Sequence, residues 1–213
     1  MIKRTKQEGT WAGDFGQSYT DRNPQSPAEM DELYRGFYGI SRTELNSEFL
    51  GDLDRGISIL EVGTNVGTQL RALQQMGFTN LTGLELQEYA LERARALSEG
   101  ITFIQGSAFD LPFTDLEFDL VFTSGVLIHL APADLNRALD EIHRCAGRWI
   151  WGFEYFAETH TSIPYRGRDD LLWKGDFARL YLDRFADLRT VRERRIPYLE
   201  SGNIDTMFLL ARV

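Results

Sequence analysis

The sequence has 213 residues, of which 43% are hydrophobic and 26% charged, so it is long enough for one well-packed globular domain. Its formal net charge of −9 argues against non-specific binding to nucleic acid or to anionic membranes. Cys145 is the only cysteine, which excludes an internal disulfide framework and a zinc site built from thiolates, and we expect no metal. The first residues, MIKRTKQEG, lack the apolar core of a signal peptide, and no apolar run reaches the ~20 residues of a spanning helix, so we expect a cytoplasmic protein.

Residues 1–50 are predicted to form a helical cover. Trp11, Phe15 and Tyr19 recur every four residues in a polar segment, a spacing that places side chains on one face of a helix. Two helix starts follow, at Ser26 and Ser41, and each serine precedes a glutamate by three residues, as in a capping box.

Residues 51–213 are predicted to form one globular unit in which strands and helices alternate. The expected strands are Ser58–Val62, Leu81–Leu86, Ile101–Gln105, Phe118–Thr123 and Trp149–Phe156. The expected helices between them are Thr68–Met76, Glu88–Ser98 and Pro132–Cys145. This alternation is typical of right-handed crossovers and a parallel sheet that helices cover on both faces.

The carboxyl-terminal part of the chain has a different pattern. A helix at Asp176–Phe185 precedes two strands, Leu188–Ile196 and Thr206–Arg212, which turn through Pro197 and Gly202. A closing hairpin makes one strand of the sheet antiparallel. We therefore predict an α/β fold, a Rossmann-like doubly wound sheet of seven strands with a helical lid at the amino terminus.

The loop after the first strand, in ILEVGTNVGTQL, has the glycine spacing of a nucleotide-binding turn. A dinucleotide fingerprint starting at Gly63 would need glycine at the third and sixth positions, where the chain has Asn65 and Thr68. No lysine follows, so the phosphate loop that ends in Lys-Ser/Thr is absent too.

A different pattern fits the same loop. The acidic residue Glu61, then Gly63, Asn65 and Gly67, resembles the first motif of class I S-adenosylmethionine-dependent methyltransferases. Asn65 replaces the commonest glycine, and asparagine tolerates left-handed backbone angles well. The loop is therefore expected to keep its shape.

Three further segments resemble later motifs of that family, in the same order. Glu85 ends the second strand, where a carboxylate can accept from both ribose hydroxyls. GSAFDLPF resembles the adenine segment, although Ser107 replaces the more usual acid, and FDLVFTSGVLIHL resembles the fourth strand and its loop. The resemblance implies S-adenosyl-L-methionine as cofactor and S-adenosyl-L-homocysteine as product. The expected cofactor-binding residues are Trp11, Tyr19, Arg22, Glu61, Gly63, Thr64, Asn65, Gly67, Glu85, Leu86, Ser107, Ala108, Phe109, Ser124, Gly125 and Val126.

The acceptor is expected beside the fourth and fifth strands. His129 follows the fourth strand and is interpreted either as a base or as a residue that shapes the loop. Glu154 and Tyr155 end the fifth strand, and with His129 they are the expected catalytic and substrate-binding residues. His143 is expected at the surface.

An insertion at about residues 157–175 is long enough to suggest a functional loop. Its Tyr165, Arg166 and Arg168 are expected to bind the acceptor, with the arginines holding a carboxylate.

Several segments resemble a narrower group, the methylases associated with pseudaminic acid biosynthesis. They include WAGDFGQSYTDRN, WIWGFEYF, LLWKGDFARLYL and NIDTMFLL. The resemblance implies a small-molecule acceptor such as a nonulosonic acid or its nucleotide precursor, with methyl transfer to oxygen or nitrogen.

Two other functions stay open. One is that the chain binds S-adenosylmethionine as a sensor or scaffold without transferring a methyl group. The other, an NAD(P)-dependent oxidoreductase, is disfavoured by Asn65 and Thr68. The amino-terminal segment is interpreted as a lid that closes over the cofactor, with Arg22 reaching the cofactor or an acceptor carboxylate, or as a helix packed permanently on the sheet edge.

Overall fold

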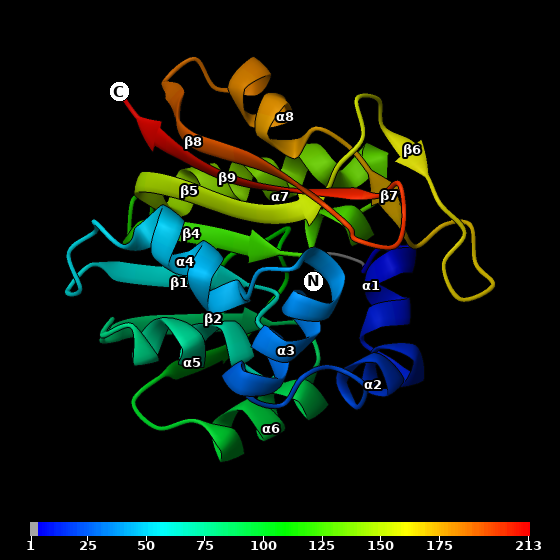
Figure 1. Ribbon diagram of the computed structural model, residues 1–213, viewed down its shortest axis with the longest axis horizontal. Helices are drawn as coiled ribbons and strands as arrows, with labels where there is room; N and C mark the ends of the chain where they lie inside the picture. The colour runs from blue at the N-terminus through cyan, green and yellow to red at the C-terminus, as the bar shows by residue number, and fades with distance from the viewer. Residues whose placement is uncertain (1–3) are drawn as a thin grey trace.

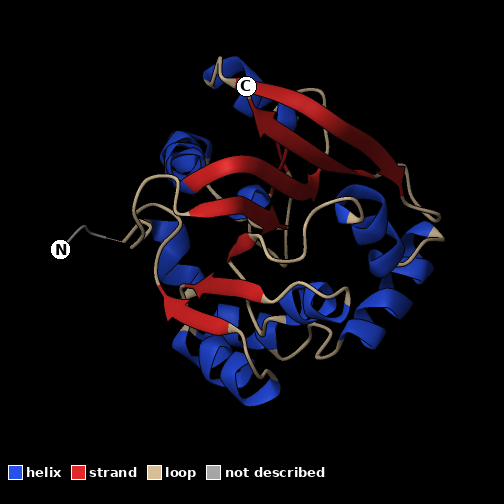
Figure 2. Ribbon diagram, turned by 90° about the vertical axis from the view of Figure 1, so that its left-hand side faces the viewer, coloured by secondary structure: helices blue, strands red, loops and turns tan. Residues whose placement is uncertain are grey.

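A computed structural model describes residues 4–213, which form one open sheet with helices on both faces (Figure 1, Figure 2). The elements in chain order are α1 (Lys6–Trp11), α2 (Asp14–Thr20), α3 (Pro27–Tyr38), α4 (Arg42–Leu50), β1 (Ser58–Val62), α5 (Thr68–Gln75), β2 (Asn80–Glu85), α6 (Glu88–Leu97), β3 (Thr102–Gln105), β4 (Phe118–Ser124), the 3-10 turn η1 (Leu127–His129), α7 (Pro132–Cys145), β5 (Ala146–Tyr155), β6 (Thr161–Ser162), β7 (Trp173–Lys174), α8 (Phe177–Arg184), β8 (Leu188–Pro197) and β9 (Ile204–Arg212). Among the described residues, no helix is both long enough and apolar enough to cross a membrane.

The main sheet has seven strands in the order β3-β2-β1-β4-β5-β9-β8. The strands from β1 to β5 pair in parallel, and β9 is antiparallel to both of its neighbours. The predicted fold class is therefore confirmed, including the single antiparallel strand. The order reverses at β1, so the chain leaves β1 and β4 toward opposite faces of the sheet, to α5 and α7. The crevice between these two connections is where ligands bind in such sheets.

Each face of the sheet carries its own apolar core. Ile150 packs on one face with residues of α7 and α8, and Trp151 and Phe153 pack on the other face with residues of α4 and α5. This division follows the alternation of side chains along β5.

The structure differs from the sequence prediction at three places. The aromatic segment forms two helices, α1 and α2, because the chain breaks at Gly13, which is the extended N-cap of α2. The capping box at Ser41 is complete, whereas the carboxylate of Glu29 accepts from the amide of Gln25 and not from that of Ser26. The insertion contains a small separate hairpin, β6–β7, whose two-residue strands are too short to show an alternating pattern in sequence.

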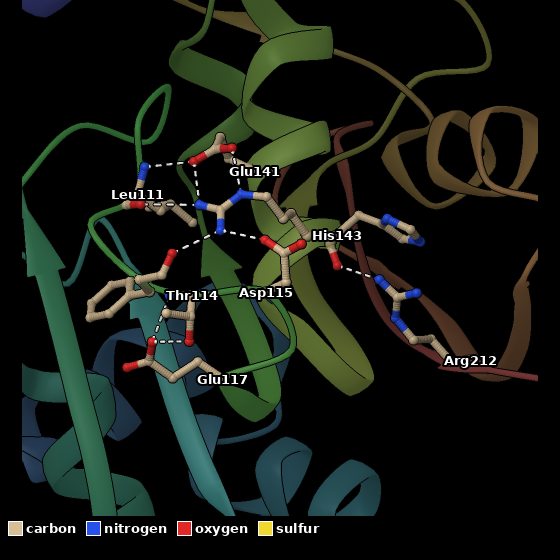
Figure 3. A network of polar contacts seen from close by, with 9 residues as sticks. Leu111, Thr114, Asp115, Glu117, Glu141, His143 and Arg212 are labelled. Carbon is tan, nitrogen blue, oxygen red and sulfur yellow. Dashed lines mark hydrogen bonds and ion pairs between the residues drawn. The ribbon is translucent and has the colours of Figure 1, made fainter.

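The end of α7, where His143 lies, is fixed by a polar network (Figure 3). Arg144 donates to Glu141, to Asp115 and to the carbonyls of Leu111 and Phe113. His143 is not a free surface residue: its ring stacks on Phe185 at 3.8 Å and pairs with Asp187 at 2.9 Å. These contacts hold the loop before β4 and the sheet edge.

Candidate functional site

A cavity of about 410 Å³ lies at the carboxyl ends of the central strands. Its wall includes the loops after β1, β2, β3 and β4, the end of β5, and residues of α1, α2 and α3. In Figure 1 the blue helices lie at the arrowhead end of β4 and β5, so they form the outer wall of this crevice. A cavity of this size accommodates a small organic ligand.

The glycine loop has the backbone that its sequence requires. Gly63, Asn65 and Gly67 have φ of 78°, 49° and 73°, in the left-handed region that glycine and asparagine tolerate. A Cβ at position 63 would lie 2.5 Å from Cγ2 of Val126, so the loop after β4 approaches too closely for any side chain. Gly63 and Asn65 line the cavity, while Gly67 caps α5 and faces the ring of Phe103 instead.

Glu85 holds the loop after β1 and lines the cavity. Its Oε2 accepts from the amide of Asn65 at 2.9 Å, and its Oε1 accepts from the amides of Leu86 and Gln87 at 2.8 and 3.0 Å. Burial raises the pKa of this carboxyl, while the three amides oppose that shift. An ionised carboxylate can accept about four hydrogen bonds, and the three amides use three of these sites. At least one site therefore remains for a hydroxyl of a ligand.

Glu61 is a second acid in the cavity wall, and only 3% of it is exposed. The hydroxyl of Thr64 donates to its Oε2 at 2.6 Å. Burial raises the pKa of Glu61 to about 8, against the opposing effects of Thr64 and Arg42. A cationic ligand group would restore the charged form of this carboxyl.

Two expected acceptor residues, Glu154 and Tyr155, also line the cavity. The carboxylate of Glu154 accepts from the amides of Val126 and Ile128 at 3.2 and 3.3 Å, which fixes the loop after β4. Burial raises the pKa of Glu154 to about 7, so it can take or release a proton near neutrality.

His129 lines the cavity between the two amino-terminal helices and the insertion. Its Nδ1 lies 2.7 Å from the carbonyl oxygen of Leu171, so this nitrogen carries the proton and Nε2 has the lone pair. Its ring lies 4.4 Å from that of Trp11 and 5.6 Å from that of Tyr165. Burial lowers the pKa of His129 to about 4, so the ring is neutral and a weak base at physiological pH. These contacts give it a structural role, and its role as a general base stays a prediction.

The lowered pKa of His129 predicts a loss of stability in mild acid. The unfolded chain takes up a proton near pH 6.5 and the folded chain only near pH 4, so stability falls as pH decreases between these values. We expect protonation of His129 to lower the free energy of unfolding by roughly 1–2 kcal/mol between pH 7 and pH 5. His129→Asn keeps a donor for the carbonyl of Leu171 and does not titrate. Urea unfolding at pH 7 and pH 5 should therefore show a smaller decrease in the free energy of unfolding for the variant than for the wild type. Equal decreases in both proteins would contradict the assignment.

The amino-terminal helices are held over the cavity by polar contacts. The side-chain amide of Gln87 donates to the carbonyls of Trp11 and Gly13 at 3.1 and 3.0 Å, and the hydroxyl of Ser107 donates to Glu8 at 2.5 Å. Few of their residues are buried: none in α1, and only Gly16 and Thr20 in α2. Segments with so little buried apolar surface open at low cost in free energy.

We therefore expect α1 and α2 to act as a lid. Deletion of residues 1–23 removes the aromatic cluster but keeps Pro24 and Gln25, whose carbonyls accept from Thr68 and Arg71. The remaining domain should stay folded and bind S-adenosylhomocysteine about 10- to 100-fold more weakly. Hydrogen exchange across residues 11–23 should slow when this ligand is added to the full chain. Exchange that is already slow without ligand, and unchanged by it, would support permanent packing.

The structure brings most of the predicted site residues together, but not all. Those that line the cavity are Trp11, Tyr19, Glu61, Gly63, Thr64, Asn65, Glu85, Leu86, Ser107, Ala108, Phe109, Ser124, Gly125, Val126, His129, Glu154 and Tyr155. Arg22 is exposed outside this lining. Tyr165, Arg166 and Arg168 are outside it as well: the Tyr165 ring packs on Phe15, and Arg168 pairs with Asp170.

Sequence reasoning missed the residues from α3, α4 and the β8–β9 hairpin. Arg42 is 1% exposed and donates to the hydroxyls of Tyr34 and Ser124, both of which line the cavity. Among residues 4–213 its Nη2 has no hydrogen-bond partner, and its guanidinium lies 4.6 Å from the ring centroid of Phe153. Asp205 also lines the cavity and is 4% exposed. No motif marks these positions, and only the β5–β9 pairing brings Asp205 to the crevice.

Comparison with known proteins agrees with this architecture. The family model described as a methyltransferase domain matches residues 60–147. An uncharacterized methyltransferase of Synechocystis is 38% identical over 89 residues, which are 42% of this chain and 42% of that protein. A sterol 24-C-methyltransferase of Gibberella zeae is 34% identical over 95 residues, which cover 42% of this chain and 24% of that protein. The chain thus spans less than half the length of these relatives.

Solved structures share the fold over nearly the whole chain. The 1,6-didemethyltoxoflavin-N1-methyltransferase of Burkholderia thailandensis, solved with S-adenosylhomocysteine, has a TM-score of 0.72 at 16% identity and covers 100% of this chain and 92% of its own. The magnesium protoporphyrin IX methyltransferase of Synechocystis has a TM-score of 0.69 at 16% identity and covers 97% of this chain and 98% of its own. Residues 60–147 thus match the methyltransferase domain model, and the chain shares its fold with these solved methyltransferases.

Proposed function

We propose that the protein is an S-adenosylmethionine-dependent methyltransferase that acts on a small molecule by in-line transfer to nitrogen or oxygen. One observation carries the proposal: a single cavity joins the glycine turn at Gly63, the carboxylate of Glu85 and the carboxylate of Glu154 at the end of β5. A donor and an acceptor could thus lie side by side in one cavity, which in-line displacement needs.

The wall fits the cofactor. Within residues 4–213, the indole N–H of Trp11 and the side-chain oxygen of Asn65 are buried without a hydrogen-bond partner, and both residues line the cavity. One donor and one acceptor are therefore available to a polar ligand. Glu85 would accept from the ribose hydroxyls, and Leu86, Ala108 and Phe109 offer an apolar slot for adenine. When bound, the cofactor supplies an electrophilic methyl group on a sulfonium.

The protein's own part is to orient the two reactants and to exclude water. Glu61 and Glu154 line the space where a sulfonium would lie, and the positive charge of that sulfonium would favour the ionised form of both carboxyls. Trp11 and Tyr19 add aromatic rings, whose faces attract cations. Glu154, with a pKa raised by burial to about 7, is suited to exchange a proton near neutrality.

The sugar-acid acceptor implied by the pseudaminic acid resemblance has weak support. The two arginines expected to hold its carboxylate, Arg166 and Arg168, do not line the cavity. We therefore keep the proposal at the level of a small-molecule acceptor.

Calorimetry and a turnover assay test the proposal together. S-adenosylhomocysteine should bind with a dissociation constant in the micromolar range, and NADH should not compete. Sugar acids, amino sugars and amino acids would be screened for release of S-adenosylhomocysteine from S-adenosylmethionine. Tight cofactor binding with no turnover on any acceptor would favour a sensor or scaffold, and binding of NADH alone would overturn the proposal.

A further inference from the structure

The far end of the cavity is a chamber of aromatic rings. We define the aromatic chamber as the part of the cavity bounded by α3, the end of β5 and the β8–β9 hairpin. Its rings form a continuous set with centroids 4.7 to 6.0 Å apart, and all of them line the cavity: Tyr34, Phe37, Tyr38, Phe153, Tyr155 and Tyr198.

One carboxylate, that of Asp205, lies in the wall of this chamber. It is 4% exposed and accepts from the hydroxyl of Tyr38. Asp205 pairs with Tyr155 in the β5–β9 register. Strand β9 is three strands from β1, or about 14 Å at the usual spacing, so Asp205 is well separated from Glu61 and Glu85 at the glycine loop. It is therefore available to a second ligand.

The described part of the cavity wall contains no lysine or arginine, whereas Glu8, Glu61, Glu85, Glu154 and Asp205 all belong to it. Two cations near the chamber, Lys174 and Arg42, lie outside the lining, and the attraction of each lowers the pKa of Asp205 against the effect of its burial. Lys174 donates to Asn203 at 2.5 Å, with its Nζ 3.9 Å from the centroid of the Tyr155 ring.

The second cation, Arg42, is bonded to Tyr34, Ser124 and Asn46. A carboxylate or phosphate on the acceptor would thus meet buried acids with no cation beside it in the wall.

The mouth of the chamber is apolar. Leu33 and Phe37 line the cavity on α3 and are 40% and 44% exposed. Leu199, in the turn of the hairpin, is 63% exposed, and its amide donates to the carbonyl of Phe37. Exposed apolar side chains at the rim of a cavity favour a ligand with an apolar body.

We propose that the acceptor is an amine with an apolar substituent, whose nitrogen lies against Asp205 inside the aromatic chamber. Tyrosine rings and a buried carboxylate together recognise an ammonium group. The inference rests on the proposed methyltransferase function and chooses nitrogen over oxygen.

The proposed methyl transfer needs only the amine, the carboxylate of Asp205 and the sulfonium. The ammonium gives one proton to the carboxylate of Asp205 and becomes a neutral amine. Its lone pair then forms the N–C bond while the C–S bond of the sulfonium breaks, and that electron pair stays on sulfur as a neutral thioether. The product is an N-methylammonium ion, and the proton on Asp205 returns to solvent when it leaves.

A matched set of three probes tests the inference on the protein with S-adenosylhomocysteine bound. 2-Phenylethylamine, 2-phenylethanol and phenylacetate have the same ring and differ in the polar group. We expect calorimetry to show the amine binding about 10-fold more tightly than the alcohol, and phenylacetate the most weakly. In Asp205→Asn, amine affinity should fall about 10- to 100-fold while affinities for the alcohol and for S-adenosylhomocysteine stay within about twofold.

Asp187→Asn is the control, because Asp187 pairs with His143 and Arg212 outside the cavity lining. It should leave all three probe affinities unchanged. Tighter binding of phenylacetate, an amine preference that survives Asp205→Asn, or no binding of any probe to the cofactor-bound protein would overturn the inference. Failure of wild-type protein to bind S-adenosylhomocysteine would instead overturn the proposed function.

Discussion

Gly63→Val is expected to remove nearly all measurable binding of S-adenosylhomocysteine. Residue 63 has φ of 78°, and its Cβ would lie 2.5 Å from Cγ2 and 3.3 Å from Cγ1 of Val126. Left-handed backbone angles cost a β-branched residue roughly 1–2 kcal/mol, and overpacking adds about 1–3 kcal/mol. If all of this free energy is lost from ligand binding, the affinity for S-adenosylhomocysteine drops by about 30- to 5000-fold.

Two further variants separate strain in the cavity from general unfolding. Gly167 has φ of 76°, and a Cβ added there would meet no heavy atom of the described chain within 4 Å. The residue lies outside the cavity lining, so Gly167→Val should leave binding unchanged. Adding Val126→Ala to Gly63→Ala removes the clashing methyl groups and should recover part of the affinity lost in Gly63→Ala alone. Normal affinity in folded Gly63→Val, measured by calorimetry, would reduce Gly63 to a structural turn.

The sequence was most informative where local chemistry determines the backbone. Glycine and asparagine tolerate the left-handed angles at positions 63, 65 and 67 well, so the residue types favour the observed shape of the loop. The strands of a doubly wound sheet are short apolar runs between helices, and their order along the chain predicts a common edge for their carboxyl ends. Residues at those ends, such as Glu85 and Glu154, are therefore predicted at the cavity, and the structure has them there.

Prediction was weaker where position depends on packing between distant segments. Asp205 reaches the aromatic chamber only because β9 runs antiparallel to β5, and Tyr38 meets it across 167 residues of sequence. The arginines of the insertion were expected at the acceptor because the loop is long and basic, but Arg168 pairs with its neighbour Asp170 and the segment packs against α1. Composition indicates which side chains a loop carries, whereas the contacts that these side chains make within the folded chain decide whether they face a ligand.

Replacement of Glu85 by alanine is expected to weaken binding of S-adenosylhomocysteine by about 30- to 1000-fold, or roughly 2–4 kcal/mol, through loss of a charged acceptor for two ribose hydroxyls. The structure adds a second effect, because the same carboxylate accepts from the amides of Asn65, Leu86 and Gln87. Glu85→Gln keeps the length of the side chain and an acceptor oxygen but removes the charge, so its affinity should lie between those of wild type and Glu85→Ala.

A deoxyribose analogue of the ligand distinguishes the direct contact from loop support. If Glu85 accepts from the ribose, wild-type protein should bind S-adenosylhomocysteine more tightly than its 2′-deoxy form, and Glu85→Ala should bind the two nearly equally. If Glu85 only holds the loop, both ligands lose affinity by the same factor and the preference of the wild type survives. The two proteins and the two ligands form a double-mutant cycle, whose coupling energy measures the contact between Glu85 and the ribose hydroxyl. Any loss of loop order in Glu85→Ala weakens both ligands equally and therefore cancels.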